Sequence, residues 1–210
     1  MREGEPQRAP QTSGRVVAVV LAAGLSSRMG QPKQLVEVDG EPMVVRAVKA
    51  ALASTAESVV VVTGAYAQPV TAALASLLQG AGNRLRTIVN PDYAEGQAGS
   101  VRAAVRMLGP ADGAVLFLPV DQPFLSPKLL NRLIDAWRRG AQLVSPTVDG
   151  ELRGAPALFD RTLWPELLAL EGDVGARPLL QRHRRHLVTV PAPLHELRDI
   201  DTPDDLAATA

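Results

Sequence analysis

The sequence predicts a single α/β domain in which helices cover both faces of a mostly parallel sheet. Short apolar runs alternate along the chain with segments whose apolar residues recur at helical spacing, which is the pattern of a parallel sheet buried on both faces. A chain of 210 residues suits one such domain with a substantial core. The chain shows no internal repeat and no long linker, so we expect one doubly wound, Rossmann-like domain over residues 15–210. Residues 1–14 are polar and are expected to form a disordered leader.

In the first half of the chain, four apolar runs are predicted to be strands and three periodic segments to be helices. Val44, Val48 and Leu52 recur at helical spacing, which predicts the first helix. Pro42 lies near the first turn of that helix, where proline is tolerated, and the second helix is expected to stop at Gly80. The expected strands are Val16–Leu21, Ser58–Val62, Leu85–Val89 and Ala114–Leu118, and the expected helices are Pro42–Ala53, Pro69–Leu78 and Ser100–Leu108.

The second half begins with a helix that has a clear start signal. Ser126 is a favoured N-cap residue, and Pro127 follows at the first helical position. This helix is expected to run to Arg139 and to stop at Gly140. The later strands are expected at Leu143–Pro146, Ala157–Phe159 and Leu187–Val190, and the later helices at Pro165–Leu170, Arg177–His183 and from Pro203 onward.

Charge and cysteine content narrow the function classes. The 22 basic and 22 acidic residues balance, so no global field favours nucleic acid or an anionic membrane as a partner. The absence of cysteine excludes disulfides, thiolate chemistry and zinc sites built on cysteine. No apolar run approaches the ~20 residues that a membrane helix needs, and the N-terminus lacks the apolar core of a signal peptide. A cytoplasmic protein is therefore expected.

The segment after the first strand is suited to holding a polyphosphate. Residues 21–35 have the sequence Leu-Ala-Ala-Gly-Leu-Ser-Ser-Arg-Met-Gly-Gln-Pro-Lys-Gln-Leu. The two glycines allow the backbone to turn and to approach a ligand closely. The serines add hydroxyl and backbone donors, and the arginine and lysine add positive charge where an anion would lie. These residues are Gly24, Ser26, Ser27, Arg28, Gly30 and Lys33.

The spacing of this segment differs from that of the two common phosphate-binding motifs. A Walker loop needs its lysine between Gly and Ser or Thr, whereas Lys33 lies between Pro32 and Gln34. The dinucleotide fingerprint needs three closely spaced glycines, which Gly24 and Gly30 do not supply. A Gly/Ser surface turn is the alternative interpretation.

Two acidic segments follow predicted strands and are candidates for holding a metal ion. Asp121 comes after Ala114–Leu118 and lies between two prolines, and Mg²⁺ commonly takes one or two carboxylates and completes its octahedron with water and phosphate. Helix capping is the alternative role for Asp121, although Ser126 already supplies a cap. Near the C-terminus, alternation along an extended segment places Asp199 and Asp201 on the same side. Asp204 and Asp205 follow them and are expected to lie in the first turn of the last helix.

Residues 21–35 and 121–123 resemble the signature of the MobA-like nucleotidyltransferases, and in particular their molybdenum cofactor cytidylyltransferase branch. That branch carries Leu-Ala-Ala-Gly-x-Ser-x-Arg-Met-Gly, followed shortly by Lys, and an Asp-x-Pro element later in the chain. The guanylyltransferase branch usually has Gly where Ala23 stands and an acidic residue where Pro32 stands. The resemblance spans residues 16–205 and is loosest on the acceptor side.

The resemblance implies a role for residues on both substrates. Arg28, Lys33 and Asp121 are the expected catalytic residues. Mg²⁺ is expected on Asp121 and Asp201, with Asp199 as the other candidate ligand. The expected nucleotide-binding residues are Leu21, Ala22, Ala23, Gly24, Ser26, Ser27, Arg28, Lys33, Asn90, Gly99, Ser100 and Asp121, and the expected acceptor-binding residues are Gly154, Asp173 and Arg177. A capped loop around Asn90–Ser100, and an ordinary turn before a helix at Asp173 and Arg177, are the alternatives.

The expected reaction is transfer of CMP from CTP to the phosphate of a molybdopterin-type cofactor, with release of pyrophosphate, in support of a molybdenum hydroxylase. We expect Lys33 and Asp121 to face each other across a gap sized for a metal-bound triphosphate. Such a transfer depends on positioning and charge stabilisation, so it needs no cysteine or histidine nucleophile. The alternatives are a guanylyltransferase, a sugar-phosphate or alcohol-phosphate nucleotidyltransferase of the same fold, and a non-catalytic nucleotide-binding cofactor chaperone.

Overall fold

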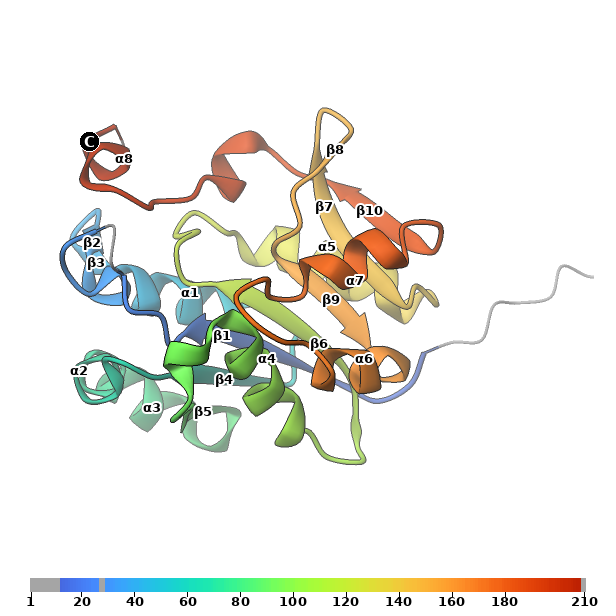
Figure 1. The fold of residues 1–210 in the computed structure, drawn as a ribbon, viewed down its shortest axis with the longest axis horizontal. Coiled ribbons are helices and arrows are strands. Elements are labelled where there is room, and N and C mark those ends of the chain that lie inside the picture. The colour runs from blue at the N-terminus through green and yellow to red at the C-terminus, as the bar shows by residue number, and fades with distance from the viewer. Residues whose placement is uncertain (1–11, 27–28, 209–210) are drawn as a thin grey trace, which may run out of the picture.

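The computed structural model describes residues 12–26 and 29–208, which form a main sheet flanked by helices (Figure 1). In spatial order the strands are β10 (Leu187–Pro191), β7 (Leu143–Val148), β9 (Ala157–Asp160), β6 (Asp112–Pro119), β1 (Arg15–Ala22), β4 (Ser58–Thr63) and β5 (Leu85–Val89), with β8 (Glu151–Leu152) beside β7. Strand β9 is antiparallel to β6 and β7, and β8 is antiparallel to β7, whereas the other neighbours are parallel. The predicted α/β class with a mostly parallel sheet is confirmed.

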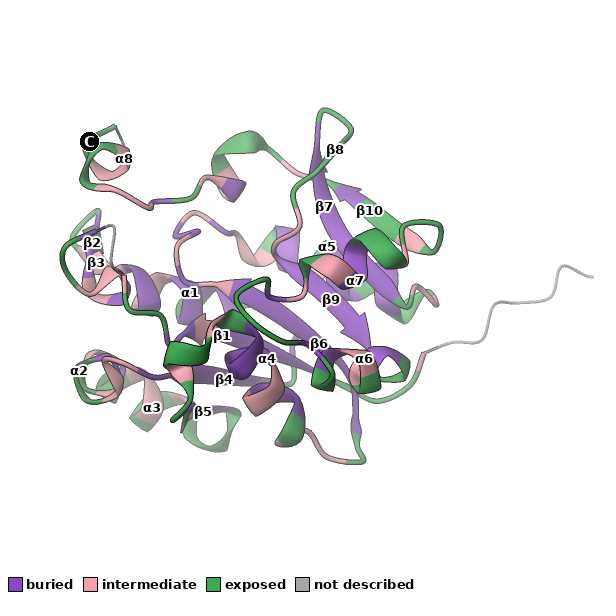
Figure 2. Cartoon of the chain, viewed as in Figure 1, coloured by how far each residue is buried: buried purple, intermediate pink, exposed green. Residues whose placement is uncertain are grey.

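Strand β1 shows why both faces of the sheet need a cover. Val16, Ala18 and Val20 pack into the core on one face, and Val17 and Val19 pack into the core on the other. All five side chains are fully buried. Because successive side chains of a strand point to opposite faces, a continuous apolar run is stable only between two layers of helices. Figure 2 shows the sheet buried between those layers.

Helices pack on both faces of this sheet (Figure 1). Helices α1 (Met43–Leu52), α2 (Ala67–Ala73) and α5 (Pro127–Arg138) contribute to the core on one face, and α4 (Gln97–Arg106), α6 (Trp164–Leu168) and α7 (Arg177–Arg182) to the core on the other. The start signal of α5 is confirmed, since the Ser126 hydroxyl oxygen accepts a hydrogen bond from the Leu129 N–H at 3.1 Å. None of the described helices is long and apolar enough to cross a membrane.

Two predicted helices differ from the structure. The helix expected at Pro69–Leu78 is in fact two, α2 and α3 (Ala75–Ala81), which are separated at Leu74, and α3 continues through Gly80. The prediction of one helix is therefore wrong. Helix α4 begins at Gln97 rather than at Ser100, because Gly96 adopts a φ of +104° that glycine tolerates and that lets the chain turn into the helix.

Several short elements were not predicted. They are β2 (Glu37–Val38), β3 (Glu41–Pro42), β8 and the 3₁₀ helices η1 (Lys33–Leu35), η2 (Gly82–Arg84), η3 (Tyr93–Glu95), η4 (Arg161–Leu163) and η5 (Leu194–Leu197). Residues 1–11 of the leader that was expected to be disordered lie outside the described residues.

The C-terminal segment runs from the edge strand β10 to the separate β2–β3 hairpin. After β10 it passes through η5 and ends in α8 (Pro203–Ala207), beside the β2–β3 hairpin (Figure 1). Ile200 is fully buried in a small cluster with Val38 and Met43. This cluster anchors the segment that carries Asp199 and Asp201 next to the loop after β1.

Candidate functional site

The loop after β1 is held in shape by a buried glutamine. Gln34 is 1% exposed, and its Nε2 donates to the carbonyl oxygens of Ala22 at 3.1 Å and Gly24 at 2.8 Å. The Ser26 hydroxyl donates to Gln34 Oε1 at 3.3 Å and accepts from the Lys33 backbone N–H at 2.9 Å. These bonds draw the two ends of the loop together. Ser27 and Arg28, both expected to bind the nucleotide, lie outside the described residues.

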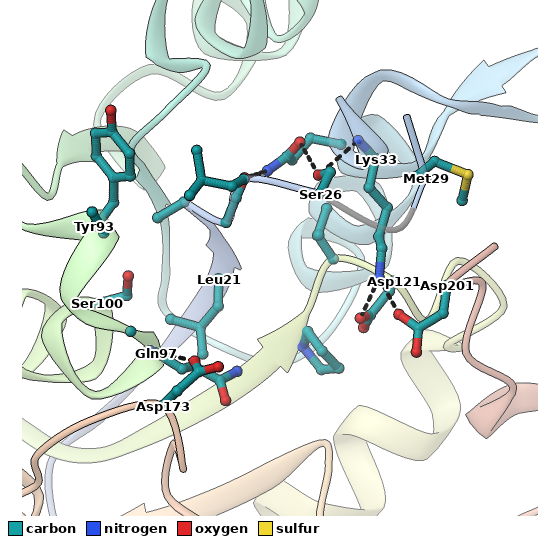
Figure 3. A pocket seen from close by; sticks show the side chains of 18 of the residues that line it. Leu21, Ser26, Met29, Lys33, Tyr93, Gln97, Ser100, Asp121, Asp173 and Asp201 are labelled. Carbon is teal, nitrogen blue, oxygen red and sulfur yellow. Dashed lines mark hydrogen bonds and ion pairs between the residues drawn. The ribbon is translucent and has the colours of Figure 1, made fainter. Parts of the chain in front are cut away.

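Lys33 reaches two carboxylates at once. Its Nζ lies 3.1 Å from Asp121 Oδ2 and also contacts Asp201 Oδ1 (Figure 3). Burial of Lys33 opposes its positive charge, but the two carboxylates outweigh that effect and raise the pKa of Lys33 above its usual range. The expectation of a gap between Lys33 and Asp121 is wrong, because the two side chains form an ion pair. The expected proximity of the three charged residues is correct.

The backbone around the two carboxylates is fixed by hydrogen bonds. The Ile200 N–H donates to the Asp121 carbonyl oxygen at 2.9 Å, which ties the C-terminal segment to the loop after β6. The Asp201 N–H donates to Asp205 Oδ2 at 3.0 Å. Asp205 and Thr202 form a capping box at the start of α8, and these hydrogen bonds, the one from the Thr202 hydroxyl foremost, lower the pKa of Asp205. Helix α5 is capped by Ser126, so Asp121 is not its N-cap residue.

Asp199 occupies a different environment from Asp201. Its Oδ1 accepts a hydrogen bond from Gln122 Nε2 at 3.0 Å, so Gln122 also fastens the C-terminal segment to the loop after β6. Burial raises the pKa of Asp199, the bond from Gln122 opposes this shift, and the nearby charges of Asp121 and Asp201 add to it.

The paired carboxylates fit a hard divalent cation. Oxygens of Asp121 and Asp201 converge on one point, which the Lys33 ammonium contacts in this structure. Carboxylate oxygens are the ligands that Mg²⁺ and Mn²⁺ prefer. The described part of the chain has no cluster of three or more His, Cys, Asp or Glu side chains arranged to hold an ion. Two carboxylates still suffice for Mg²⁺, since water and phosphate commonly supply its other ligands.

A cavity of about 610 Å³ opens next to this charged group. The loop after β1 and the charged side chains form one wall, and Tyr93, Gln97, Ser100 and Asp173 form the opposite wall (Figure 3). The predicted residues that line it are Leu21, Ala23, Gly24, Ser26, Lys33, Ser100, Asp121, Asp173 and Asp201. A polar cavity between a lysine and a helix start is suited to a polyphosphate ester.

Of the predicted nucleotide-binding residues that the structure describes, three do not line the cavity. Asn90 is 2% exposed, and its Nδ2 donates to the Ser100 hydroxyl oxygen at 3.1 Å, so it positions Ser100. Gly99 packs against Asn90, with a Cβ at that position lying 3.2 Å from Asn90 Nδ2. Ala22 holds Gln34 through its carbonyl oxygen.

The wall opposite the lysine depends on a contact between distant segments. The Gln97 N–H at the start of α4 donates to Asp173 Oδ1 at 3.0 Å, and the Ala98 N–H donates to the Gly172 carbonyl oxygen at 3.1 Å. A Cβ at Gly96 would lie 2.7 Å from the Gly172 carbonyl oxygen, so only glycine allows this approach. Asp173 therefore caps α4 from another part of the chain.

A second cavity of about 610 Å³ adjoins the first. Gly154, Asp173 and Arg177, the three predicted acceptor residues, all line it. Four residues line both cavities, namely Leu21, Gln97, Pro119 and Asp173. Sequence reasoning missed Gln97 and Arg153, which lines the second cavity, although each directly neighbours a glycine in one of the candidate segments.

Comparisons with known proteins agree with this architecture. Residues 18–187 match the MobA-like NTP transferase domain. The chain is 33% identical to the purine catabolism protein PucB of Bacillus subtilis over 90% of this chain and 93% of that protein. It is 35% identical to nicotine blue oxidoreductase of Paenarthrobacter nicotinovorans, over 80% of this chain and 82% of that protein. It is 30% identical to a molybdenum cofactor guanylyltransferase of Sinorhizobium fredii, over 92% of this chain and 90% of that protein.

Another group of relatives is much longer. The chain is 40% identical to the bifunctional protein GlmU of Sorangium cellulosum over 59% of this chain, but the match spans only 26% of that protein. The chain thus spans about a quarter of the length of these relatives.

Solved structures show the same fold. A crystal structure of Rv0371c from Mycobacterium tuberculosis superposes with a TM-score of 0.72 at 28% identity, covering 94% of this chain and 98% of that one. A second structure of that protein is a complex with manganese. It superposes with a TM-score of 0.72 at 26% identity, covering 93% of this chain and 97% of that one. The family match over residues 18–187, together with relatives of 30–35% identity that cover most of the chain, shows that the chain belongs to the MobA-like NTP transferase family.

Proposed function

We propose that this protein is a divalent-metal-dependent cytidylyltransferase that transfers CMP from CTP to the phosphate of a molybdopterin-type cofactor and releases pyrophosphate. The observation that carries the proposal is the convergence of Lys33, Asp121 and Asp201 beside a cavity that adjoins a second one. Two adjoining cavities suit a two-substrate transfer, because the two substrates can then lie side by side where the cavities join. The manganese complex of a structural relative supports a divalent cation.

The chemistry asks for positioning and charge rather than for a protein nucleophile. A phosphate oxygen of the acceptor attacks the α-phosphorus of CTP, a new P–O bond forms, and the bond from the α-phosphorus to the bridging oxygen breaks. The electron pair leaves with pyrophosphate. The acceptor phosphate is already ionised near neutral pH, so the site needs no strong general base.

The roles of the residues follow from their positions. Lys33 donates to the triphosphate and neutralises the departing pyrophosphate, and Arg28 is proposed to do the same. Asp121 and Asp201 would hold the cation. When bound, the cation supplies further neutralisation of the phosphate oxygens. Gln34 and Ser26 keep the loop in the shape that presents its backbone to the nucleotide.

The second cavity is the proposed acceptor site. Arg153 and Arg177 line it, and arginine pairs with phosphate through two parallel hydrogen bonds. Its lining also includes Phe117 and Phe159, whose rings meet edge to face at 5.9 Å. Both rings are buried and lie beneath the cavity, so the feature that favours an acceptor with a phosphate is the pair of arginines. A cytoplasmic molybdenum hydroxylase is the proposed recipient of the finished cofactor.

The nucleotide is proposed to be CTP because of two positions in the loop. Ala23 and Pro32 differ from the Gly and the acidic residue that are usual in the guanylyltransferase branch. Ala23 lines the first cavity, so it lies where a nucleotide would contact it. A guanylyltransferase is the second candidate, favoured by the relative of that name.

Pyrophosphate release tests the proposal. With Mg²⁺ and molybdopterin, we expect release from CTP and little from GTP or ATP, and a clear preference for GTP would overturn the cytidylyl assignment. Asp121→Asn should abolish turnover while the protein still folds. Asp135→Asn on α5 is the matched control, since this carboxylate is half exposed and does not line either cavity. Unchanged turnover in Asp121→Asn would overturn the role of this carboxylate, whereas no turnover by the wild type with any nucleotide would favour a cofactor chaperone.

A further inference from the structure

We propose that Lys33 occupies the cation position when no nucleotide is bound, so that a divalent cation binds weakly there until the triphosphate enters the site. This proposal rests on the metal-dependent nucleotidyl transfer proposed above. It adds a role for Lys33 before the reaction, when the lysine keeps a free cation out of the site.

The first argument is that one position serves two cations. The Lys33 ammonium lies 3.1 Å from Asp121 Oδ2 and also contacts Asp201 Oδ1 (Figure 3). Mg²⁺ binds oxygen at about 2.0–2.1 Å, so a cation held by these two oxygens would lie where the ammonium now is. Two like charges at that separation also repel strongly in a partly buried site. Either the ammonium or the divalent cation can hold this pair of oxygens, but not both.

The second argument is that displacing Lys33 without a substitute partner is costly. The Lys33 side chain is only 12% exposed, so an ammonium that loses both carboxylates has little water to compensate for them. A divalent cation arriving alone must therefore overcome the existing ion pairs. The free energy needed to break these ion pairs lowers the affinity of the cation for the nucleotide-free protein.

The third argument is that the nucleotide provides the substitute partner. The Lys33 backbone is fixed by its bond to the Ser26 hydroxyl oxygen, but its four-carbon side chain can rotate without moving the loop. Lys33, Gly24 and Ser26 line the same cavity, so triphosphate oxygens bound there lie within the reach of the ammonium. When Lys33 turns to the phosphate, Asp121 and Asp201 lose its charge and attract a cation more strongly. Binding of the nucleotide thus strengthens binding of the cation, and the reverse, in addition to the direct contact between the two.

Manganese binding to the nucleotide-free protein tests this inference. Free Mn²⁺ is measured by electron paramagnetic resonance during titration of the wild type and of Lys33→Met, which keeps the apolar length and removes the charge. We expect Lys33→Met to bind Mn²⁺ at least tenfold more tightly than the wild type. Adding Asp121→Asn to Lys33→Met should remove this gain, which locates the bound ion. Equal or weaker Mn²⁺ binding by Lys33→Met would overturn the proposal.

Two controls keep the result interpretable. Lys49→Met removes an exposed lysine of α1 that pairs with Glu41 of β3, and it should leave Mn²⁺ affinity unchanged. If Lys33→Met does not fold, Lys33→Gln makes the same test with a polar neutral side chain. If the wild type releases no pyrophosphate from any nucleotide, the proposed reaction fails while a gain of Mn²⁺ affinity still stands. If CTP turnover is intact and Lys33→Met shows no gain, only the present inference fails.

Discussion

The carboxylate of Asp173 accepts a hydrogen bond from the Gln97 backbone N–H at 3.0 Å, although the two residues are 76 positions apart in the chain. The residue that precedes the helix, Gly96, has no side chain that can cap it. Asp173 thus acts as a helix cap supplied from another segment, and it fixes the wall that the two cavities share.

This geometry predicts that Asp173 positions the wall. Asp173→Ala should lower stability by about 1 kcal/mol, the usual cost of removing a helix cap, and should raise KM for both substrates. Asp173→Asn keeps an oxygen that can accept from Gln97, so we expect most of the stability and both KM values to be retained. Thermal unfolding and steady-state kinetics measure these effects. If the charge of Asp173 instead contacts the acceptor, Asp173→Asn would lose acceptor affinity as severely as Asp173→Ala.

The raised pKa of Asp199 predicts a pH-dependent stability change. A carboxyl whose pKa is higher in the folded than in the unfolded protein binds its proton more tightly when folded. Its contribution is present at low pH and is lost as the pH rises through the folded pKa, so the ionised group destabilises the protein at neutral pH. Asp199→Asn removes this cost and can still accept the bond from Gln122. We expect a higher melting temperature than the wild type at pH 7.

The pH profile separates this cause from a general effect of the substitution. Below the ordinary Asp pKa of about 4, the carboxyl is protonated in both states, so the difference between Asp199→Asn and the wild type should vanish. Asp149→Asn, in the exposed turn before β8, is the matched control and should leave the melting temperature unchanged at either pH. A lower melting temperature for Asp199→Asn than for the wild type at pH 7 would contradict a destabilising role of the ionised carboxylate.

The parts of the fold that the sequence predicts best are those set by local pattern. Strand β1 is recognisable because residues 16–20 are all apolar and buried on both faces, and α5 because Ser126 and Pro127 mark its start. The break at Leu74 between α2 and α3 has no comparable signal, since neither glycine nor proline occurs there. Local pattern therefore predicts which elements exist more reliably than where a helix is interrupted.

In the candidate site too, local pattern predicts which residues take part but not how they contact one another. Asp121 could be predicted because it closely follows the end of β6, where ligands bind in such sheets, and Lys33 and Asp201 because they lie in segments that resemble the family signature. Their direct ion pairing could not, because it depends on how the C-terminal segment is anchored by Ile200. Gln34 was missed for a similar reason. Its role depends on hydrogen bonds to carbonyl oxygens of the folded loop, and no spacing rule shows these.

Arg153 and Arg177 give a prediction that separates the two cavities. Both line the second cavity and neither lines the first, so their charges should act on the acceptor and not on the nucleotide. Replacing either with Met keeps much of the apolar stem and removes the phosphate-binding group. A lost hydrogen bond to a charged group costs about 1.5–3 kcal/mol, so the KM for molybdopterin should rise roughly tenfold or more. The KM for CTP should stay within twofold.

Steady-state kinetics with each substrate varied in turn measure the two constants, and Arg139→Met, an exposed arginine that follows α5, is the matched control. A rise in the KM for CTP equal to that for molybdopterin would show that the two cavities do not divide the substrates. A normal KM for molybdopterin in both variants would place the acceptor phosphate elsewhere. If only Arg177→Met raises it, Arg177 alone binds that phosphate, and the exposed Arg153 contributes no more than general positive charge to the rim.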